Sequence, residues 1–364
     1  MKQDTAWMQE ALNLAKTYAQ TTRPNPAVGC VIVKNGQIVG RGAHKKAGGP
    51  HAEVYALHEA KEFAQGATLF VTLEPCNHTG RTPPCTEAII QAGIKHVVIA
   101  QKDPNPKVSG AGIERLQKAG LDVEVGLLSE KARILNEIYL WGYENDVPYF
   151  ILKWAMSLDG KSATSSGQSQ WLTADITRQH AHAWRDQVDA IMIGSGTVQA
   201  DRPHLTVRLP EKNEIPPVRI LLDTHFQIAH DQPLMQPDAP TWIFTHTLPQ
   251  KAMPTHVRLY QTPLDATGKL DLRYVAYTLN QEGIHSVLVE GGPTLLFSLI
   301  EARLVQKVIT YIAPLVIGGD GRFSAVTGSG FTHLQDALQL SIQKWQAIGP
   351  DLYVEGSVHV HRSD

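Results

Sequence analysis

Three residues of the types that bind zinc lie between positions 51 and 85. His51 opens the run His51-Ala52-Glu53, Cys76 follows a proline, and Cys85 comes after eight intervening residues. Zinc prefers thiolate and imidazole ligands, and a catalytic zinc keeps three protein ligands with one position open for water. His51, Cys76 and Cys85 supply that count. The spacing therefore predicts one catalytic zinc per chain on these three residues.

Glu53 lies two residues beyond His51, near the start of a predicted helix. From there it could reach a zinc-bound water, whose pKa the metal lowers toward neutrality, without being a ligand itself. It could then take the proton of that water and return it to a leaving amine. Zinc deaminases use this logic with His-x-Glu followed by Pro-Cys-x-x-Cys. This chain departs from that template only in the longer distance between its cysteines.

Two other interpretations of the zinc pattern stay open. The site could be structural, with His78 as a fourth ligand, or the three residues could fall into the pattern by chance. The segment between the cysteines is polar and is stiffened by Pro83-Pro84. His44 and His58 are expected to be surface or helix residues, and Cys30 in an apolar strand is expected to be a small buried hydrophobe.

Chemical signals are more dispersed in the second half. Gly291-Gly292 follows a predicted strand and opens an apolar helix, an arrangement that lets backbone amides approach a phosphate. It is neither a GxGxxG nor a Walker sequence, and a plain turn is the alternative. Arg185, Arg202 and Arg208 form a basic patch only if the fold gathers them, and otherwise each is a solvated surface residue.

The elements that must position these residues alternate between strands and helices, which is typical of α/β proteins. In the first half, Asn35-Gly36 joins two strands as a hairpin turn. The predicted helices there cover 7–18, 51–60, 86–92, 113–119 and 129–143, and the predicted strands cover 27–33, 38–40, 67–73, 96–100 and 121–125.

A polar and helix-breaking stretch at 144–148 is the best linker candidate, so we predict domains 1–146 and 147–364. Residues 203–217 are expected to form a loop. In the second domain, strands are predicted over 149–154, 190–193, 218–222, 241–244 and 287–289, helices over 173–187, 274–281 and 295–300, and late, antiparallel strands over 309–317 and 352–361.

Composition sets limits on the function. The 364 residues correspond to roughly two domains at about 150 residues each. The net charge of −2 argues against a protein that coats nucleic acid or binds anionic membranes. We find no apolar run of membrane-spanning length, no secretion signal and too few cysteines for a disulfide framework. A cytoplasmic protein is the expectation.

The motifs of the first half resemble the deaminase half of the bifunctional bacterial deaminase–reductases of riboflavin biosynthesis. The resemblance rests on residues 22–30, 51–53 and 74–85, which read TRPNPAVGC, HAE and EPCNHTGRTPPC. It implies a cytidine-deaminase-like, three-layer α/β/α domain that hydrolytically deaminates 2,5-diamino-6-(5-phosphoribosylamino)pyrimidin-4(3H)-one. It also implies that Asn25 holds the pyrimidine, for which an amide with both a donor and an acceptor is suited.

The resemblance continues through the second half, over residues 153–161, 169–171, 196–208 and 290–292. It implies a dihydrofolate-reductase-like α/β domain that uses NADPH to reduce the ribosyl group to a ribityl chain, giving 5-amino-6-(5-phosphoribitylamino)uracil. The choice of NADPH over NADH rests on this resemblance alone, because no basic pair in the sequence indicates a site for the 2′-phosphate.

The family's site residues carry over position by position. The implied cofactor contacts are Ala155, Trp171, Thr197, Asp201, Thr224, Gly292, Pro293, Thr294, Leu295, Leu296, Phe297 and Ser298. The implied substrate contacts are Ser169, Arg185, Leu205, Arg208 and Glu290. Ser169, Arg185 and Arg208 make sense as a phosphate clamp. Leu205 could contribute only backbone or packing, and Asp201 is a candidate catalytic acid near the sugar.

Two alternative functions remain at this point. The second domain could be inactive, leaving a deaminase alone, or the chain could be a zinc-dependent deaminase that edits nucleic acid. The charge balance and the absence of a basic stripe interleaved with aromatic residues oppose the latter. We expect a small phosphorylated pyrimidine as substrate, no nucleic-acid or membrane partner, and a homo-oligomer, as is common for reductases of this fold.

Overall fold

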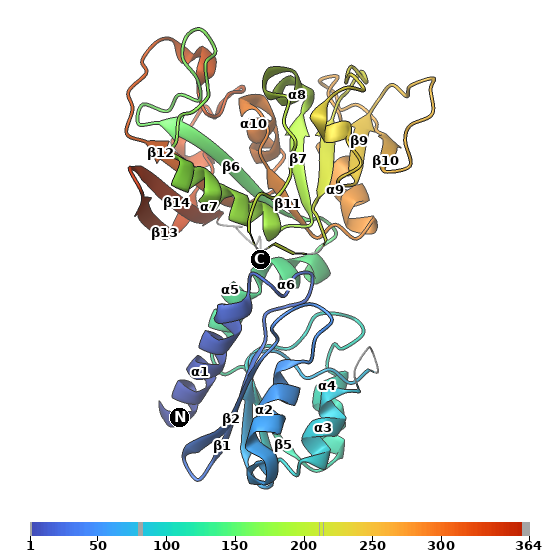
Figure 1. Cartoon of the computed structure of the whole chain (residues 1–364), viewed down its shortest axis with the longest axis vertical. Helices are drawn as coiled ribbons and strands as arrows, with labels where there is room; N and C mark the ends of the chain where they lie inside the picture. Colours follow the sequence, from blue (N-terminus) through green and yellow to red (C-terminus); the bar gives the residue numbers. More distant parts are fainter. Residues whose placement is uncertain (1, 79–82, 211, 214, 359–364) are drawn as a thin grey trace. The chain divides into compact units, whose positions relative to one another are not determined.

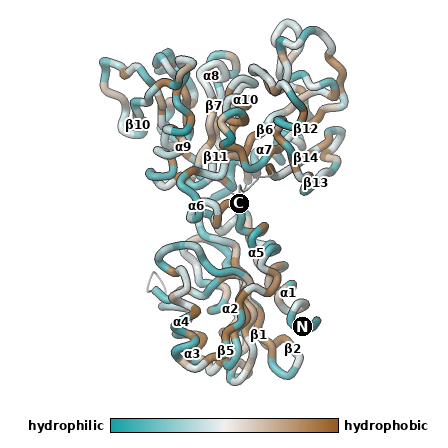
Figure 2. The backbone as a smooth tube through the Cα atoms, turned by 180° about the vertical axis from the view of Figure 1, so that it is seen from behind, coloured by the Kyte–Doolittle hydropathy of each residue, from teal (hydrophilic) through white to brown (hydrophobic). Residues whose placement is uncertain are grey.

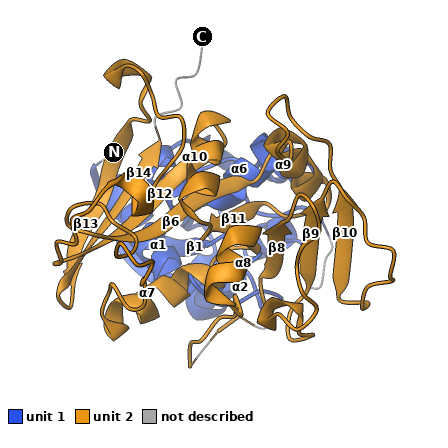
Figure 3. Ribbon diagram, turned by 90° about the horizontal axis from the view of Figure 1, so that it is seen from above, with its two compact units in different colours: residues 1–145 blue, residues 146–364 orange. Residues whose placement is uncertain are grey.

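The structure is a computed structural model that describes residues 2–78, 83–210, 212–213 and 215–358. The chain divides into two compact units, residues 1–145 and 146–364, which Figure 3 colours separately. Each unit has its own sheet and its own core (Figure 1). Among the residues described, no helix combines the length and the apolar character that crossing a membrane requires.

Unit 1 contains a five-stranded sheet in the order β2-β1-β3-β4-β5. The first three strands of that order pair antiparallel, and β3, β4 and β5 pair parallel. The predicted hairpin at Asn35-Gly36 is confirmed. The strands are β1 (Gly29–Lys34), β2 (Gln37–Ala43), β3 (Thr68–Val71), β4 (His96–Ile99) and β5 (Asp122–Val125).

Helices cover both faces of this sheet, because successive side chains of each strand point to opposite sides. Cys30 and Ile32 of β1 pack with α2, α3 and α4, whereas Val31 and Val33 pack with α1 and α5. The predicted three-layer α/β/α architecture is therefore confirmed, as is the burial of Cys30. The helices are α1 (Lys2–Tyr18), α2 (Ala52–Ala60), α3 (Cys85–Gln91), α4 (Ala111–Lys118), α5 (Ser129–Leu135) and α6 (Glu137–Glu144), and the 3₁₀ turn η1 (Lys61–Ala64) extends α2.

One expected helix of unit 1 is wrong. The helix predicted over 129–143 is interrupted at Asn136, which separates α5 from α6. The Asn136 side chain is buried and bonds twice to one residue, accepting from Ala27 N at 2.8 Å and donating to Ala27 O at 2.9 Å. This long-range contact fixes the break, and hydrophobic periodicity carries no sign of it.

Unit 2 contains a nine-stranded sheet in the order β10-β9-β8-β7-β11-β6-β12-β14-β13. Pairing is parallel from β10 to β12 and antiparallel for the last two pairs. The strands are β6 (Tyr149–Ser157), β7 (Ala190–Gly194), β8 (Val218–Leu222), β9 (Thr241–Thr245), β10 (Val257–Gln261), β11 (Ser286–Val289), β12 (Val305–Ala313), β13 (Leu340–Ile348) and β14 (Asp351–Val358).

Helices lie on both faces of this sheet, with α9 and α10 on one side and α7 and α8 on the other (Figure 3). The main core of the unit lies between the strands and α9 and α10. Figure 2 shows the hydrophobic character of the central strand β11. The helices are α7 (Asp175–Asp186), α8 (Ser195–Asp201), α9 (Leu272–Gln281) and α10 (Pro293–Glu301), with short 3₁₀ turns η2 (Pro233–Met235), η3 (Gly321–Phe323) and η4 (Leu334–Asp336).

Several elements of unit 2 differ from the sequence-based expectation. The strands β10 and β13 and the short helix α8 were not anticipated. β10 and β13 are edge strands, and β13 is largely exposed, so its hydrophobic alternation is weak. The strand expected at 309–317 is β12, four residues earlier, and it pairs parallel with β6 and antiparallel with β14. The expected strand at 352–361 is β14, and residues 359–361 lie outside the described part.

Candidate active sites

The predicted zinc ligands converge in unit 1, and we call His51, Cys76 and Cys85 the metal cluster. Their ligand atoms all lie within 4.8 Å of one another. His51 Nδ1 is 3.4 Å from Cys76 Sγ and 3.2 Å from Cys85 Sγ. One imidazole and two thiols at this separation are the donor set that zinc prefers. The residues therefore fit a zinc ion.

Helix starts and one loop position the metal cluster. His51 is the residue that caps α2, Cys85 is the first residue of α3, and Cys76 lies in the loop that follows β3. Gly42 of β2 allows α2 to lie close to the sheet, since a Cβ at that position would come within 2.0 Å of the Ala52 carbonyl oxygen. The glycine thus sets the position from which His51 and Glu53 reach the site.

A buried carboxylate that sequence reasoning missed holds the Cys76 loop. Glu74 is 4% exposed, and its two oxygens accept four backbone N–H groups, those of Asp103, Gly110, Gly112 and Ile113, at 3.0 to 3.3 Å. Three of these donors lie at the start of α4. A Cβ at Gly112 would come within 2.1 Å of the Pro75 carbonyl oxygen. The only available signal was an acidic residue immediately before Pro75-Cys76.

Glu53 lies in the first turn of α2 and is 3% exposed. Burial raises the pKa of Glu53 to about 7, against the opposing attraction of His51. The thiol of Cys85 donates to the Cys76 sulfur and so lowers the Cys76 pKa, while the same pairing raises that of Cys85. A buried carboxylate able to hold a proton therefore lies beside the metal cluster.

Asn25 is connected to the metal cluster through His44. The amide Nδ2 of Asn25 is 3.1 Å from His44 Nε2, and His44 Nδ1 is 3.0 Å from the Pro50 carbonyl oxygen. The His44 ring also meets the His51 ring edge-on at 5.6 Å. The expectation of a surface His44 is wrong, because the residue is 3% exposed. The amide is held with its nitrogen toward His44, which leaves Oδ1 to accept from a ligand.

The interpretation of a four-ligand structural zinc receives no support from His78. His78 is exposed and does not belong to the metal cluster. Residues 79–82, which complete the segment between the cysteines, lie outside the described part of the chain. The three-ligand arrangement, which leaves a coordination position open, is the one that the described residues form.

A cavity of about 1690 Å³ lies in unit 2, at the carboxyl ends of the parallel strands β6, β7, β8 and β11. Ligands of open α/β sheets bind at such ends. Pockets for one drug-sized molecule span about 300–1,000 Å³, so this cavity has room for a dinucleotide and a second ligand. It is lined by the predicted residues Ala155, Ser169, Trp171, Arg185, Thr197, Asp201, Leu205, Arg208, Thr224, Glu290, Gly292, Pro293, Thr294, Leu295, Leu296 and Ser298.

Phe297 is the predicted contact that does not line the cavity. Its ring packs toward the opposite side, where it meets Phe331 at 5.6 Å and closes against Gly328. Adjacent residues of an α-helix point about 100° apart, so a continuous run along α10 cannot face one cavity with every side chain. Leu205 is buried with φ 52°, which fits the expectation that it offers backbone or packing.

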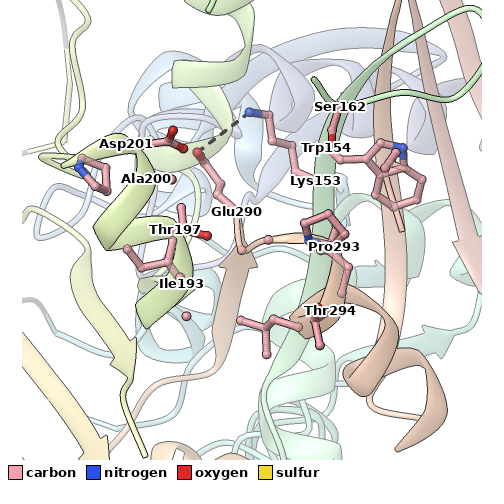
Figure 4. A pocket seen from close by; sticks show the side chains of 18 of the residues that line it. Lys153, Trp154, Ser162, Ile193, Thr197, Ala200, Asp201, Glu290, Pro293 and Thr294 are labelled. Carbon is pink, nitrogen blue, oxygen red and sulfur yellow. Dashed lines mark ion pairs between the residues drawn. The ribbon is translucent and has the colours of Figure 1, made fainter. Parts of the chain in front are cut away.

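Glu290 lies between two cations at the centre of the cavity lining. Arg185 holds it bidentately, with Nε–Oε1 and Nη2–Oε2 both at 2.8 Å, and Lys153 Nζ lies 3.8 Å from Oε2 (Figure 4). Burial alone would raise the pKa of Glu290, but Arg185 and Lys153 outweigh it and hold that pKa well below its usual range. Lys153 was quoted within a motif and given no role of its own.

Arg185 has partners within the protein that the sequence did not indicate. Besides Glu290, Arg185 donates from Nη1 to the Thr206 carbonyl oxygen at 3.0 Å. Three of its five N–H groups are therefore held by protein, and two of the three are held by Glu290. Arg208, in contrast, is exposed on the cavity wall without a hydrogen bond or ion pair to any residue the structure describes. Of the two arginines expected to bind phosphate, Arg208 is therefore the one whose guanidinium no described residue engages.

Asp201 ends α8 and points toward Glu290 (Figure 4). Partial burial raises the pKa of Asp201, which favours the protonated form expected of an acid. On another part of the wall, Lys269 and Arg273 line the cavity with Thr224. Sequence reasoning missed these two cations, because neither belongs to a recognisable motif. Lys269 lies in the loop before α9, and Arg273 lies in the first turn of α9.

Comparisons with known proteins cover nearly the whole chain. The RibD C-terminal domain family matches residues 148–354, and the zinc-binding region of cytidine and deoxycytidylate deaminases matches residues 1–101. The riboflavin biosynthesis protein RibD of Escherichia coli (strain K12) is 43% identical over 361 residues, which cover 96% of this chain and 98% of that protein.

Solved structures give the same result. RibD of Acinetobacter baumannii (form 1) superposes with a TM-score of 0.87 and 37% identity over 99% of both chains. A Thermotoga maritima protein, described as a diaminohydroxyphosphoribosylaminopyrimidine deaminase/5-amino-6-(5-phosphoribosylamino)uracil reductase, superposes with a TM-score of 0.82 and 33% identity. That match covers 98% of this chain and 99% of the other.

Proposed function

Because the chain belongs to the RibD family of riboflavin-biosynthesis proteins, we propose that its two units divide the family's two reactions between them. The chain is a bifunctional deaminase and reductase, with a zinc-binding deaminase domain and an NADPH-dependent reductase domain. We assign deamination to residues 1–146 and reduction to residues 147–364. In support, α6 ends at Glu144 and β6 begins at Tyr149.

Deamination is assigned to the metal cluster and Glu53. His51, Cys76 and Cys85 would hold zinc, which when bound lowers the pKa of a coordinated water toward neutrality. Glu53 takes a proton on its carboxylate and delivers it to the amine that leaves the pyrimidine. Asn25 orients the ring through the oxygen that its contact with His44 leaves free. The observation that carries this assignment is the buried Glu53 beside three converging zinc-type ligands.

Reduction is assigned to the cavity of unit 2. NADPH supplies the hydride there. Gly292 and the start of α10 would hold its pyrophosphate, because the positive end of the helix dipole favours an anion. Glu290 is held by Arg185 for contact with the sugar, and Arg208 is left for the phosphate. Asp201, whose pKa is raised, is the acid that assists opening of the ribose ring.

The substrate in the RibD family is a small phosphorylated pyrimidine. For this chain we propose 2,5-diamino-6-(5-phosphoribosylamino)pyrimidin-4(3H)-one, which is deaminated and then reduced to 5-amino-6-(5-phosphoribitylamino)uracil. The family match over residues 148–354 supports an active second domain over the deaminase-only alternative. A homo-oligomer, a cytoplasmic location and the absence of a nucleic-acid partner remain predictions.

The decisive experiment supplies purified protein with the deaminated intermediate and NADPH. We expect absorbance at the nicotinamide band to fall with the formation of the ribityl product. A parallel assay supplies the diamino substrate without NADPH, and release of ammonia is expected. No loss of absorbance in the first assay, from a preparation active in the second, would refute the reductase assignment and leave the deaminase.

A further inference from the structure

One face of α7 lines the cavity of unit 2, and a histidine that has no role so far lies within it. The residues of that face recur at helical spacing, and they are Thr177, Arg178, Ala181, His182 and Arg185. His182 comes one turn before Arg185, the residue that holds Glu290. Its ring therefore lies on the same wall as the predicted substrate contacts.

The two nitrogens of His182 have different surroundings. Nδ1 is buried in protein without a hydrogen-bond partner. A buried N–H that lacks an acceptor is rarer in proteins than a buried acceptor that lacks a donor. The proton of the neutral ring therefore belongs on Nε2, which no residue of the described chain engages. His182 then offers one N–H donor to a ligand on the cavity wall.

Charged groups around the ring keep it neutral. Burial, helped by the cations of Arg185, Arg208 and Lys153 and opposed by the attraction of Glu290, lowers the pKa of His182 to about 4. The single charge of Glu290 offsets only one of the two charges of Arg185 and Lys153, and Arg208 has no carboxylate partner among the described residues. This part of the wall carries an excess of positive charge beside a neutral donor.

We propose that His182 is a specificity-determining residue that donates from Nε2 to the phosphate group of the substrate, next to Arg208. A phosphate has three oxygens that accept charge-assisted hydrogen bonds, so it can take donors from a cation and from a neutral ring together. The inference rests on the proposed reductase function. It adds His182 to the implied phosphate clamp of Ser169, Arg185 and Arg208.

The test compares three variants of the full chain. His182→Phe keeps a ring but removes the donor, and His182→Gln places an amide N–H near the former Nε2. Gln179→Ala, on an exposed part of the same helix, is the matched control. For each, KM and kcat of reduction are measured with the phosphorylated intermediate, kcat/KM with the corresponding nucleoside lacking phosphate, and ammonia release as a check on folding.

We expect His182→Phe to raise KM for the phosphorylated intermediate about tenfold, while kcat and the nucleoside's kcat/KM stay near wild type. His182→Gln should stay within about threefold of wild type, and Gln179→Ala should match it. An unchanged KM in His182→Phe, an equal loss with nucleotide and nucleoside, or an equal loss in His182→Gln would overturn the inference. A wild-type chain that reduces neither compound would instead refute the proposed function.

Discussion

The metal cluster of unit 1 and the cavity of unit 2 are built in different ways. The metal cluster takes its ligands from a stretch of 35 residues, each at a helix start or in the loop after one strand. The cavity takes its lining from residues between Lys153 and Ala325, at the ends of several strands. The first site is therefore a local pattern, and the second exists only when the sheet has formed.

This difference governs how each site tolerates substitution. At the metal cluster, the chemistry depends on a few atoms, so one change removes the reaction and leaves the fold. In the cavity, Glu290 and Arg185 belong both to the lining and to the packing of unit 2. A change there affects stability and binding together, and the two effects must be measured separately.

The largest expected effect is at Glu53. Glu53→Gln should lower the rate of deamination about 10³-fold, because the amide cannot shuttle a proton, within the range typical for loss of a general acid–base. Zinc content should remain at one per chain, because Glu53 is not a ligand. Deaminase assays and metal analysis of the same preparation check both parts.

The reductase is the internal control for this change. NADPH oxidation with the deaminated intermediate should be unaffected in Glu53→Gln, and also after a chelator has removed zinc from the wild-type chain. Loss of zinc in the variant would contradict the division of roles between Glu53 and the metal cluster. Loss of reduction on chelation would contradict the independence of the two sites.

The next effect concerns the stability of unit 2. Arg185→Ala leaves Glu290 buried without its bidentate partner, and breaking a buried pair in this way costs about 3 kcal/mol in the free energy of unfolding. Urea unfolding followed by tryptophan fluorescence measures it. Arg202→Ala is the matched control, since its ion pair with Asp231 is exposed and should contribute less than about 1 kcal/mol.

The same variant has a pH dependence of known sign. In the wild type the folded pKa of Glu290 is lowered, so its contribution is complete above the unfolded-state pKa of about 4.3 and is lost as pH falls through the folded value. In Arg185→Ala, the strongest of the attractions that oppose burial is lost, and the folded pKa of Glu290 rises. The difference in free energy of unfolding between wild type and Arg185→Ala should therefore be largest near neutral pH and should become smaller as the pH falls. A deficit independent of pH would contradict this assignment.

A smaller effect is expected at Glu74, which holds the loop that carries Cys76. Glu74→Gln turns one acceptor oxygen into a donor that faces two backbone N–H groups, and this should cost about 2 kcal/mol of stability in unit 1. Zinc should also dissociate more readily, because the Cys76 loop is less well held. Glu87→Gln, at a half-exposed pair with Arg115, is the control. Equal effects in both variants would show that Glu74 has no special role.

The two sites also differ in how far the sequence could predict them. His51, Cys76, Cys85 and Glu53 followed from ligand chemistry and spacing, because the metal imposes both. Most of the cavity residues came only through a family resemblance, since contacts such as that between Arg185 and Glu290 span 105 residues. The burial of His44 and the break at Asn136 accompany hydrogen bonds to residues outside their own elements, which leave no periodic signal. Edge strands such as β13 were missed because their side chains are largely exposed, which weakens the alternation of hydrophobic and polar residues.

The smallest expected effect is at Arg208, and it is selective because only the KM for the phosphorylated intermediate should change. Its guanidinium is exposed and has no hydrogen bond or ion pair among the described residues, so Arg208→Ala should leave stability within about 0.5 kcal/mol of wild type. KM for the phosphorylated intermediate should rise about tenfold, equivalent to about 1.4 kcal/mol, with kcat unchanged, because the phosphate is bound equally before and during hydride transfer. Steady-state reduction assays separate the two constants. A normal KM with reduced kcat would instead place Arg208 at the reacting carbon. The reaction in the cavity would then depend on a few residues, as it does at the metal cluster.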